Sequence, residues 1–219
     1  MNVDRTIALS GVVFAIATFA GLMLLLSGAA VGESTNAEAA EWLSQSAHRT
    51  RAMAGGYVMC GGAIAFMVFA AALLDRLRSA QAPALAVGVA QIAAIAFVIL
   101  TLAAAIGMAS AAYAVSSSVE PTPIDPGAVR VTTYGFALWA IAGALAGATF
   151  VAAVSVAVLA SRALPRWLAL VGFLLAGVAV FGIAFLPTLG LLVWAVLVAI
   201  VAVARGVTAP AVEPQLSGA

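Results

Sequence analysis

The chain has 219 residues, of which 65% are apolar and only 8% are charged. An ordinary soluble domain is about 25% charged, so a soluble fold would leave too much apolar surface in water, and the composition predicts an integral membrane protein. Nine basic residues stand against eight acidic ones, without a basic cluster, which argues against nucleic acid as a partner.

Six apolar segments follow one another along the chain, and each is long enough for a helix of the ~20 residues that cross a ~30 Å hydrocarbon core; the third and fourth are longer than a crossing needs. They predict an all-α fold, a polytopic bundle of six transmembrane helices that forms a single domain over residues 1–206. Residues 207–219 are predicted to be a short, disordered cytoplasmic tail. The expected spans cover about residues 7–29, 52–74, 83–113, 131–159, 167–186 and 187–204.

The arginines predict the orientation of these spans. All nine basic residues are arginines, which indicates a GC-rich, bacterial source. With six spans, one side of the membrane receives Arg5, Arg76, Arg78, Arg162, Arg166 and Arg205, and the other receives Arg49, Arg51 and Arg130. The excess of positive charge marks the cytoplasmic side. We therefore expect a multi-pass protein of the inner (plasma) membrane with both termini in the cytoplasm.

The first outer segment, residues 35–50, has helical periodicity. Thr35 and Glu38 have the spacing of a helix-starting capping box. The polar face would carry Glu38, Glu41, Gln45, His48 and Arg49. Trp42 and Leu43 lie on the opposite face, so we expect a short amphipathic helix on the membrane surface, with these two side chains in the interface and Glu41, His48 and Arg49 available to a partner. The alternative is a polar extension of the second span.

The predicted spans contain no Asp, Glu, Lys, Arg or His. Pumps and ion-coupled carriers usually need such a group at membrane depth. His48 is the sole histidine and lies outside the spans, which excludes a two-histidine haem site within one chain. Glu38, Glu41 and His48 fit a solvated helix face better than a metal site, and no hydrolase or phosphate-loop motif is present. The sequence therefore predicts no enzyme, no metal and no cofactor.

Small residues mark the helix faces that we expect to make contacts. Gly143 and Gly147 form a small-xxx-small pair in the fourth span, and Gly56 with Cys60 forms another in the second. Such pairs allow close helix approach, either inside this bundle or against a partner. Gln91 is the most polar side chain of the spans, and it predicts an interhelical hydrogen bond, with a substrate contact as the alternative.

One segment resembles a known family. Residues 161–172 read Ser-Arg-Ala-Leu-Pro-Arg-Trp-Leu-Ala-Leu-Val-Gly, followed by Ala176 and Gly177. The segment resembles the fifth-helix entry of an uncharacterised family of bacterial six-helix membrane proteins, a domain of unknown function, and residues 5–11 are similar to that family's start. Ala169 stands where a glycine is expected. The resemblance implies a six-helix architecture and no particular activity.

These observations favour a non-catalytic membrane subunit or scaffold that binds lipid, another membrane protein or a second copy of itself. The alternative is a passive or lipid-type transporter with an uncharged groove around Gln91, and an enzyme on the outer face is the third hypothesis. A transporter would need an enclosed polar cavity between the third and fourth spans, which a scaffold would lack.

Overall fold

The computed structural model describes residues 3–27, 36–117, 126–180 and 189–208, and every element in these ranges is a helix. The prediction of an all-α fold is therefore confirmed for this part of the chain. Four helical stretches are long and apolar enough to cross a membrane. These are α1 (Val3–Leu26), α3 (Ser46–Ser79), α4 (Ala84–Ser117) and the run that ends in α6 (Ala144–Ser161).

Two apolar helices are shorter. They are α7 (Arg166–Val180), about 22 Å long at ~1.5 Å per residue, and α9 (Gly190–Thr208), about 28 Å long. The predicted boundary between the fifth and sixth spans falls at residues 186 and 187, outside the described residues. Most of the predicted tail is outside them as well, but residues 207 and 208 belong to α9.

Helices α3 and α4 have 34 residues each and extend beyond the predicted spans 52–74 and 83–113. A helix pairs its own backbone groups, so its end need not coincide with the end of its apolar sequence. Helix α3 therefore continues into polar flanks, Ser46 to Arg51 at its start and Asp75 to Arg78 at its end, and α4 continues past its predicted end to Ser117.

The fourth predicted span is a continuous helical run with a change of geometry in the middle. It begins as α5 (Pro126–Ala137), passes through a π-helical turn, η1 (Leu138–Gly143), and continues as α6. A π-helical turn inserts an extra residue into the ladder of hydrogen bonds and shifts the faces that precede and follow it. Trp139 and Ala140 of this turn are buried.

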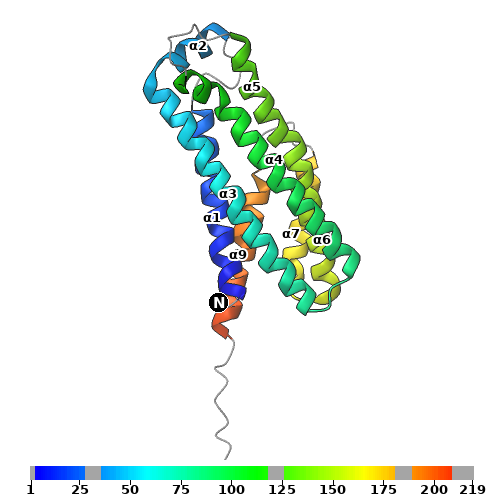
Figure 1. Cartoon of the computed structure of the whole chain (residues 1–219). Coiled ribbons are helices and arrows are strands. Elements are labelled where there is room, and N and C mark those ends of the chain that lie inside the picture. Colours follow the sequence, from blue (N-terminus) through cyan, green and yellow to red (C-terminus); the bar gives the residue numbers. More distant parts are fainter. Residues whose placement is uncertain (1–2, 28–35, 118–125, 181–188, 209–219) are drawn as a thin grey trace, which may run out of the picture.

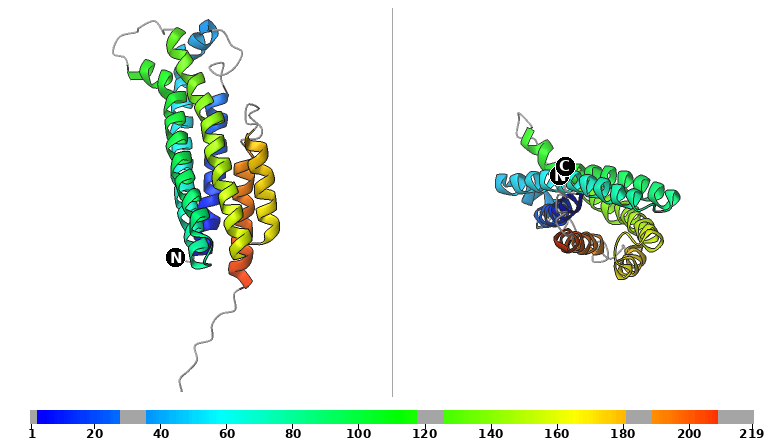
Figure 2. Two further views of the ribbon diagram at one scale, coloured as in Figure 1. Left: turned by 90° about the vertical axis from the view of Figure 1, so that its right-hand side faces the viewer. Right: turned by 90° about the horizontal axis from the view of Figure 1, so that it is seen from below.

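The long helices form a closed ring. Helix α3 packs between α1 and α4, α6 connects α4 with α7, and α9 lies between α7 and α1. Figure 1 shows the two termini of the helical bundle at one end and α2 (Asn36–Ser44) across the other. In Figure 2, left, α7 and α9 lie side by side and stop well short of the end that carries α2. We call the end that holds the two termini of the bundle the basic end, after its arginines, and the opposite end the α2 end.

Aromatic side chains fill the middle of the ring. They come from α1, α3, α4, α6 and α9, and each is at most 1% exposed: Phe14, Phe66, Phe69, Phe97, Phe150 and Trp194. Phe66 has the ring centroids of three other phenylalanines within 5.2 Å. The ring centroid of Trp194 lies 6.0 Å from that of Phe150 and 6.4 Å from that of Phe69, and both pairs meet edge to face. These contacts join five helices through one cluster.

The two ends of the bundle differ in charge. The start of α1, the hairpin between α3 and α4 and the hairpin between α6 and α7 all lie at the basic end (Figure 1). This end carries Arg5, Arg76, Arg78, Arg162 and Arg166. A salt bridge between Asp4 and Arg76 ties α1 to α3 there. Arg49 and Arg51 start α3 at the α2 end, so the fold separates these arginines into the two groups expected from the sequence.

Candidate functional site

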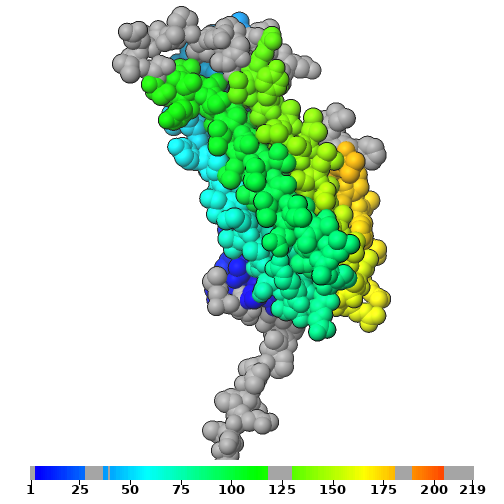
Figure 3. Space-filling view, turned by 45° about the vertical axis from the view of Figure 1, so that its right-hand side comes forward, coloured from blue at the N-terminus to red at the C-terminus, as the bar shows by residue number. Residues whose placement is uncertain are grey.

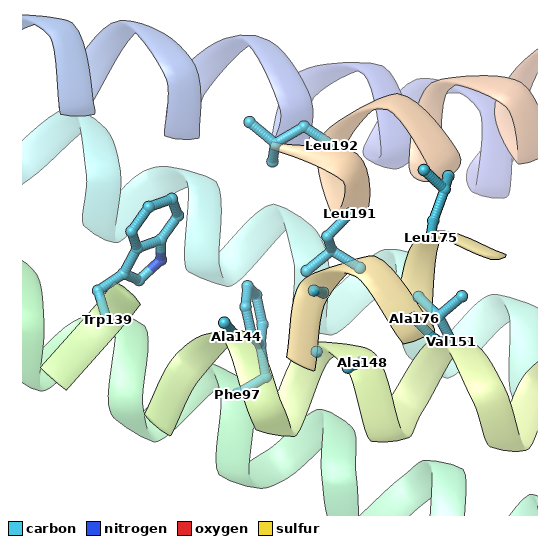
Figure 4. A pocket seen from close by; sticks show the side chains of 11 residues that line it. Phe97, Trp139, Ala144, Ala148, Val151, Leu175, Ala176, Leu191 and Leu192 are labelled. Carbon is cyan, nitrogen blue, oxygen red and sulfur yellow. The ribbon is translucent and has the colours of Figure 1, made fainter. Parts of the chain in front are cut away.

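The interior between α4, α6, α7 and α9 holds only a small apolar void. Its volume is about 10 Å³, and Figure 4 shows its lining. Phe97 and Trp139 enclose it on one side, and Leu175, Leu191 and Leu192 on the other. This volume is at the lower limit for a single water molecule, which would also need polar partners. This void between the third and fourth predicted spans is therefore apolar and too small for a ligand.

Gly56 and Gly147 lie at contacts between helices. A Cβ added to Gly56 would lie 2.9 Å from the Cβ of Ala109 on α4. A Cβ added to Gly147 would lie 2.8 Å from Leu191 Cδ2 on α9 and 3.4 Å from Phe97 on α4. Both glycines are buried within this bundle, so their faces pack against the chain's own helices.

Gly143 is different, although the sequence pairs it with Gly147. It closes the π-helical turn, and the nearest atom to an added Cβ is Trp139 Cδ1 of its own helical run, at 3.4 Å. That is the distance of an ordinary van der Waals contact. The atoms nearest to Gly143 thus belong to its own helical run, and a role in contact with a neighbouring helix stays a prediction.

The closest backbone approaches involve glycines that the sequence motifs did not single out. A Cβ on Gly21 of α1 would lie 2.6 Å from the backbone nitrogen of Met59 on α3, and one on Gly135 of α5 would lie 2.7 Å from that of Met108 on α4. Gly62 similarly faces the backbone of Thr18 at 2.9 Å. The presence of a glycine in an apolar helix does not single these positions out, because Gly61, Gly88 and Gly177 also lie in such helices and have nothing within 4 Å of an added Cβ.

The outer segment differs from its prediction. Helix α2 ends at Ser44, and Gln45 has an extended backbone that separates it from α3. Leu43 is only 2% exposed and packs in a cluster with Ala52, Ala111 and Ala112. Leu43 is therefore buried in the protein and does not reach into a membrane interface. The chain turns at Gln45, so residues 35–50 cannot form one amphipathic face. Thr35, the first residue of the proposed capping box, lies outside the described residues.

The first turn of α3 caps the end of α2. One guanidinium nitrogen of Arg49 donates to the carbonyl oxygens of Leu43 at 2.8 Å and Ser44 at 2.7 Å. The cationic group thereby satisfies unpaired carbonyls at the negative end of the α2 dipole. The turn at Gln45 thus holds the partly buried Arg49 against α2, and its contact with a partner stays a prediction.

His48 and Trp42 also face each other, and both are partly buried. Their rings stack at a centroid distance of 4.5 Å and an angle of 9°. The Nδ1 atom of His48 lies 2.9 Å from the carbonyl oxygen of Trp42, so this nitrogen carries the donated proton. Of the expected polar face, Glu38, Glu41 and Gln45 are exposed, whereas His48 and Arg49 are partly buried.

Two hollows of about 400 Å³ lie on the outer surface of the ring, besides one of about 250 Å³ that Tyr57 and Tyr113 help to line. One, about 420 Å³, runs between α1 and α9 and is lined by apolar side chains such as Ile16, Phe19 and Val193. The other, about 410 Å³, runs between α3 and α4 toward the basic end. Its lining consists of Met67, Ala70, Ala71, Leu74, Arg78, Gln91, Ala94, Ile95, Val98 and Ile99.

Gln91 lies in this second groove with its side chain exposed. Its Oε1 atom accepts a hydrogen bond of 2.5 Å from Arg78 of α3. The bond joins two helices, as the sequence predicts for Gln91. The role of Arg78 was missed, although the short connection between α3 and α4 makes an antiparallel hairpin that brings residues 78 and 91 together.

No family model, curated protein or solved structure matches the chain. The resemblance to the six-helix family therefore stays a prediction. Within the described ranges, no three His, Cys, Asp or Glu side chains are close enough to hold a metal ion. The candidate site is thus the outward groove between α3 and α4, where polar groups and apolar surface meet.

Proposed function

We propose that this protein is a non-catalytic scaffold or accessory subunit of a bacterial inner membrane, with six membrane-crossing helices and both termini in the cytoplasm. Its partners are lipid and another membrane protein or a second copy of itself. The observation that carries the proposal is the aromatic cluster of the ring, which leaves a void of only about 10 Å³ in the described interior.

An interior of this kind supports binding on the outside of the bundle. Transport through the ring would require polar groups or water along its axis. Phe66, Phe97 and Phe150 occupy that axis with ring contacts of 4.6 and 5.2 Å. The two grooves of about 400 Å³ lie on the outer surface instead. A groove open to the side accepts a lipid chain or a neighbouring helix without opening the core.

The proposal of six spans combines the four long helices with the two shorter ones. Helix α7 with the apolar residues that follow it in the sequence, and α9 with those that precede it, each reach the ~20 residues of a span. The excess of arginine at the basic end supports its placement in the cytoplasm.

Co-purification tests the scaffold function. The protein, tagged and extracted in mild detergent, should elute with a stoichiometric membrane protein or as a dimer of itself, identified by mass spectrometry and by mass in solution. An unrelated tagged six-span protein, purified in parallel, removes proteins that simply follow detergent micelles. A lipid-bound monomer without any partner protein in repeated preparations would contradict the scaffold function.

Thiol labelling tests the orientation. Cys60 is the native cysteine, so Cys60→Ala provides the background. Ser117→Cys, at the end of α4, should react with an impermeant maleimide on intact cells, while Ser79→Cys, at the end of α3, should react only after the cells are opened; both serines are exposed. The reverse pattern would overturn the proposed topology.

A lipid-type transporter is the second candidate, and the groove beside Gln91 is the observation that favours it. In vesicles that contain a fluorescent phospholipid, a transporter would move the label between leaflets faster than protein-free vesicles do. The scaffold function predicts equal rates.

A further inference from the structure

The groove between α3 and α4 combines an apolar trough with a cationic end. Figure 3 shows α3 and α4 side by side along this face of the molecule. Three alanines in its lining, Ala70, Ala71 and Ala94, have small side chains that leave space open. Larger side chains such as Met67 and Ile95 line the rest of the groove. Arg78 and Gln91 are the only charged or amide side chains in its lining.

Arg78 has no carboxylate partner among the described residues, in contrast to Arg76, which is paired with Asp4. Its guanidinium donates to Oε1 of Gln91. Because an arginine only donates, that bond leaves the NH₂ group of Gln91 free to donate in turn. The groove therefore presents a positive charge and a second donor from two different helices, a combination that suits the oxygens of a phosphate group.

The length of the trough fits one acyl chain. Along α3, the eleven residue steps from Arg78 to Met67 cover about 16 Å at ~1.5 Å per residue. Half of a ~30 Å hydrocarbon core is about 15 Å. The groove thus runs from the level of the basic end to about the middle of the membrane, as a chain of one leaflet does.

We propose that the α3–α4 groove is a binding site for an anionic phospholipid of the cytoplasmic leaflet, with its phosphate on Arg78 and Gln91 and one acyl chain along Ala70, Ala71 and Ala94. The proposal rests on the membrane orientation proposed above and names the lipid that the scaffold holds. A zwitterionic phospholipid fits the trough equally well but carries an ammonium group that Arg78 repels. The site therefore selects by the net charge of the head group.

Native mass spectrometry of the delipidated, detergent-solubilised full chain tests this selection. Phosphatidylglycerol and phosphatidylcholine with identical chains are added in turn. The wild type should bind the anionic lipid about tenfold more tightly, the scale expected when a hydrogen-bonded charge is gained. Arg78→Gln should lose this preference. Arg162→Gln, which removes another exposed arginine at the same end but outside the groove, should retain it.

A second pair of variants tests the trough itself. Ala71→Phe fills the groove from an exposed position, and Ala103→Phe adds the same side chain to an exposed position outside it. The first should weaken binding of both lipids and the second should leave binding unchanged. Because neither residue is buried, both variants should fold, and thermal unfolding in detergent verifies this.

Three results would overturn the lipid site. They are equal affinity of the wild type for the two lipids, an unchanged preference in Arg78→Gln, and displacement of the anionic lipid by inorganic phosphate at the same concentration, which would indicate a site for the anion alone. If the lipid preference fails while a partner protein still co-purifies, the scaffold function stands without this site. If the preference holds and no partner appears, the lipid site stands without the scaffold function.

Discussion

The contact between α1 and α3 and the π-helical turn before α6 both contain glycines in apolar sequence, yet the two regions use them differently. At Gly21 the backbone of α3 lies where a side chain would be, 2.6 Å from the position of a Cβ. At Gly143 the three nearest atoms belong to Trp139 and Leu138 of the same helical run, and none is closer than 3.4 Å. The comparison teaches that a glycine matters when a neighbouring backbone occupies the space of its missing side chain, whatever its spacing from the next glycine.

The sharpest test of this difference is Gly21→Ala. The methyl group would meet Met59 N at 2.6 Å and the carbonyl oxygen of Gly55 at 2.8 Å, and neither atom can move without moving α3. We expect a loss near the upper end of the ~1–3 kcal/mol typical of overpacking, measured as a lower midpoint of thermal unfolding in detergent. Gly61→Ala is the matched control, because nothing lies within 4 Å of its added Cβ. Equal midpoints for the two variants would contradict the close contact of α1 and α3.

An intermediate effect is expected for Gly147→Ala. The nearest atom to its added Cβ is Leu191 Cδ2 at 2.8 Å, the far end of a side chain that can rotate. The small void beside both residues gives that leucine some room. We expect destabilisation of about 1 kcal/mol, the lower part of the range for overpacking, and partial recovery in the double variant with Leu191→Val. If Leu191→Val does not recover any of the loss, the strain comes from another contact.

The smallest effect belongs to Gly143→Ala. Its added Cβ would lie 3.4 Å from Trp139 Cδ1, an ordinary contact. Alanine favours helical backbone over glycine by up to about 1 kcal/mol, so the unfolding midpoint should stay the same or rise slightly. Destabilisation as large as that of Gly21→Ala would remove the distinction between the two regions.

The grooves extend the comparison from the interior to the surface. Inside the ring, large aromatic side chains from five helices fill the space, and only about 10 Å³ is left. Between α3 and α4, small side chains such as Ala70, Ala71 and Ala94 leave an open trough of about 410 Å³. The sizes of the side chains thus decide that this larger hollow lies on the outside of the bundle.

Several features of the fold follow from local sequence alone. Long apolar segments must be helical in a membrane because the backbone has to pair its own hydrogen bonds there, and the structure has helices in each described part of the predicted spans. Arginine positions relative to the helix ends also predict which ends lie together. Gln91 could also be identified from the sequence, because a polar side chain in an apolar helix needs a hydrogen-bond partner on another helix.

The α2 end could not be predicted in the same way. Trp42, Leu43, His48 and Arg49 have a helical spacing that fits a surface helix, but a single extended residue, Gln45, breaks that helix. The break allows Leu43 to be buried and Arg49 to bind the carbonyls of Leu43 and Ser44. Periodicity assumes one continuous axis, so it fails where tertiary contacts stabilise a turn.

The sequence by itself determined the helical class, the apolar character of the helices and the separation of the arginines between two ends, because these depend on residue type and on position along one chain segment. Only the tertiary structure decided which glycines meet a backbone, that the aromatic rings fill the centre, and that Arg78 reaches Gln91 beside an open trough. Those features depend on the distance and rotation between helices, and in a chain this rich in alanine, leucine and glycine many arrangements have similar local patterns.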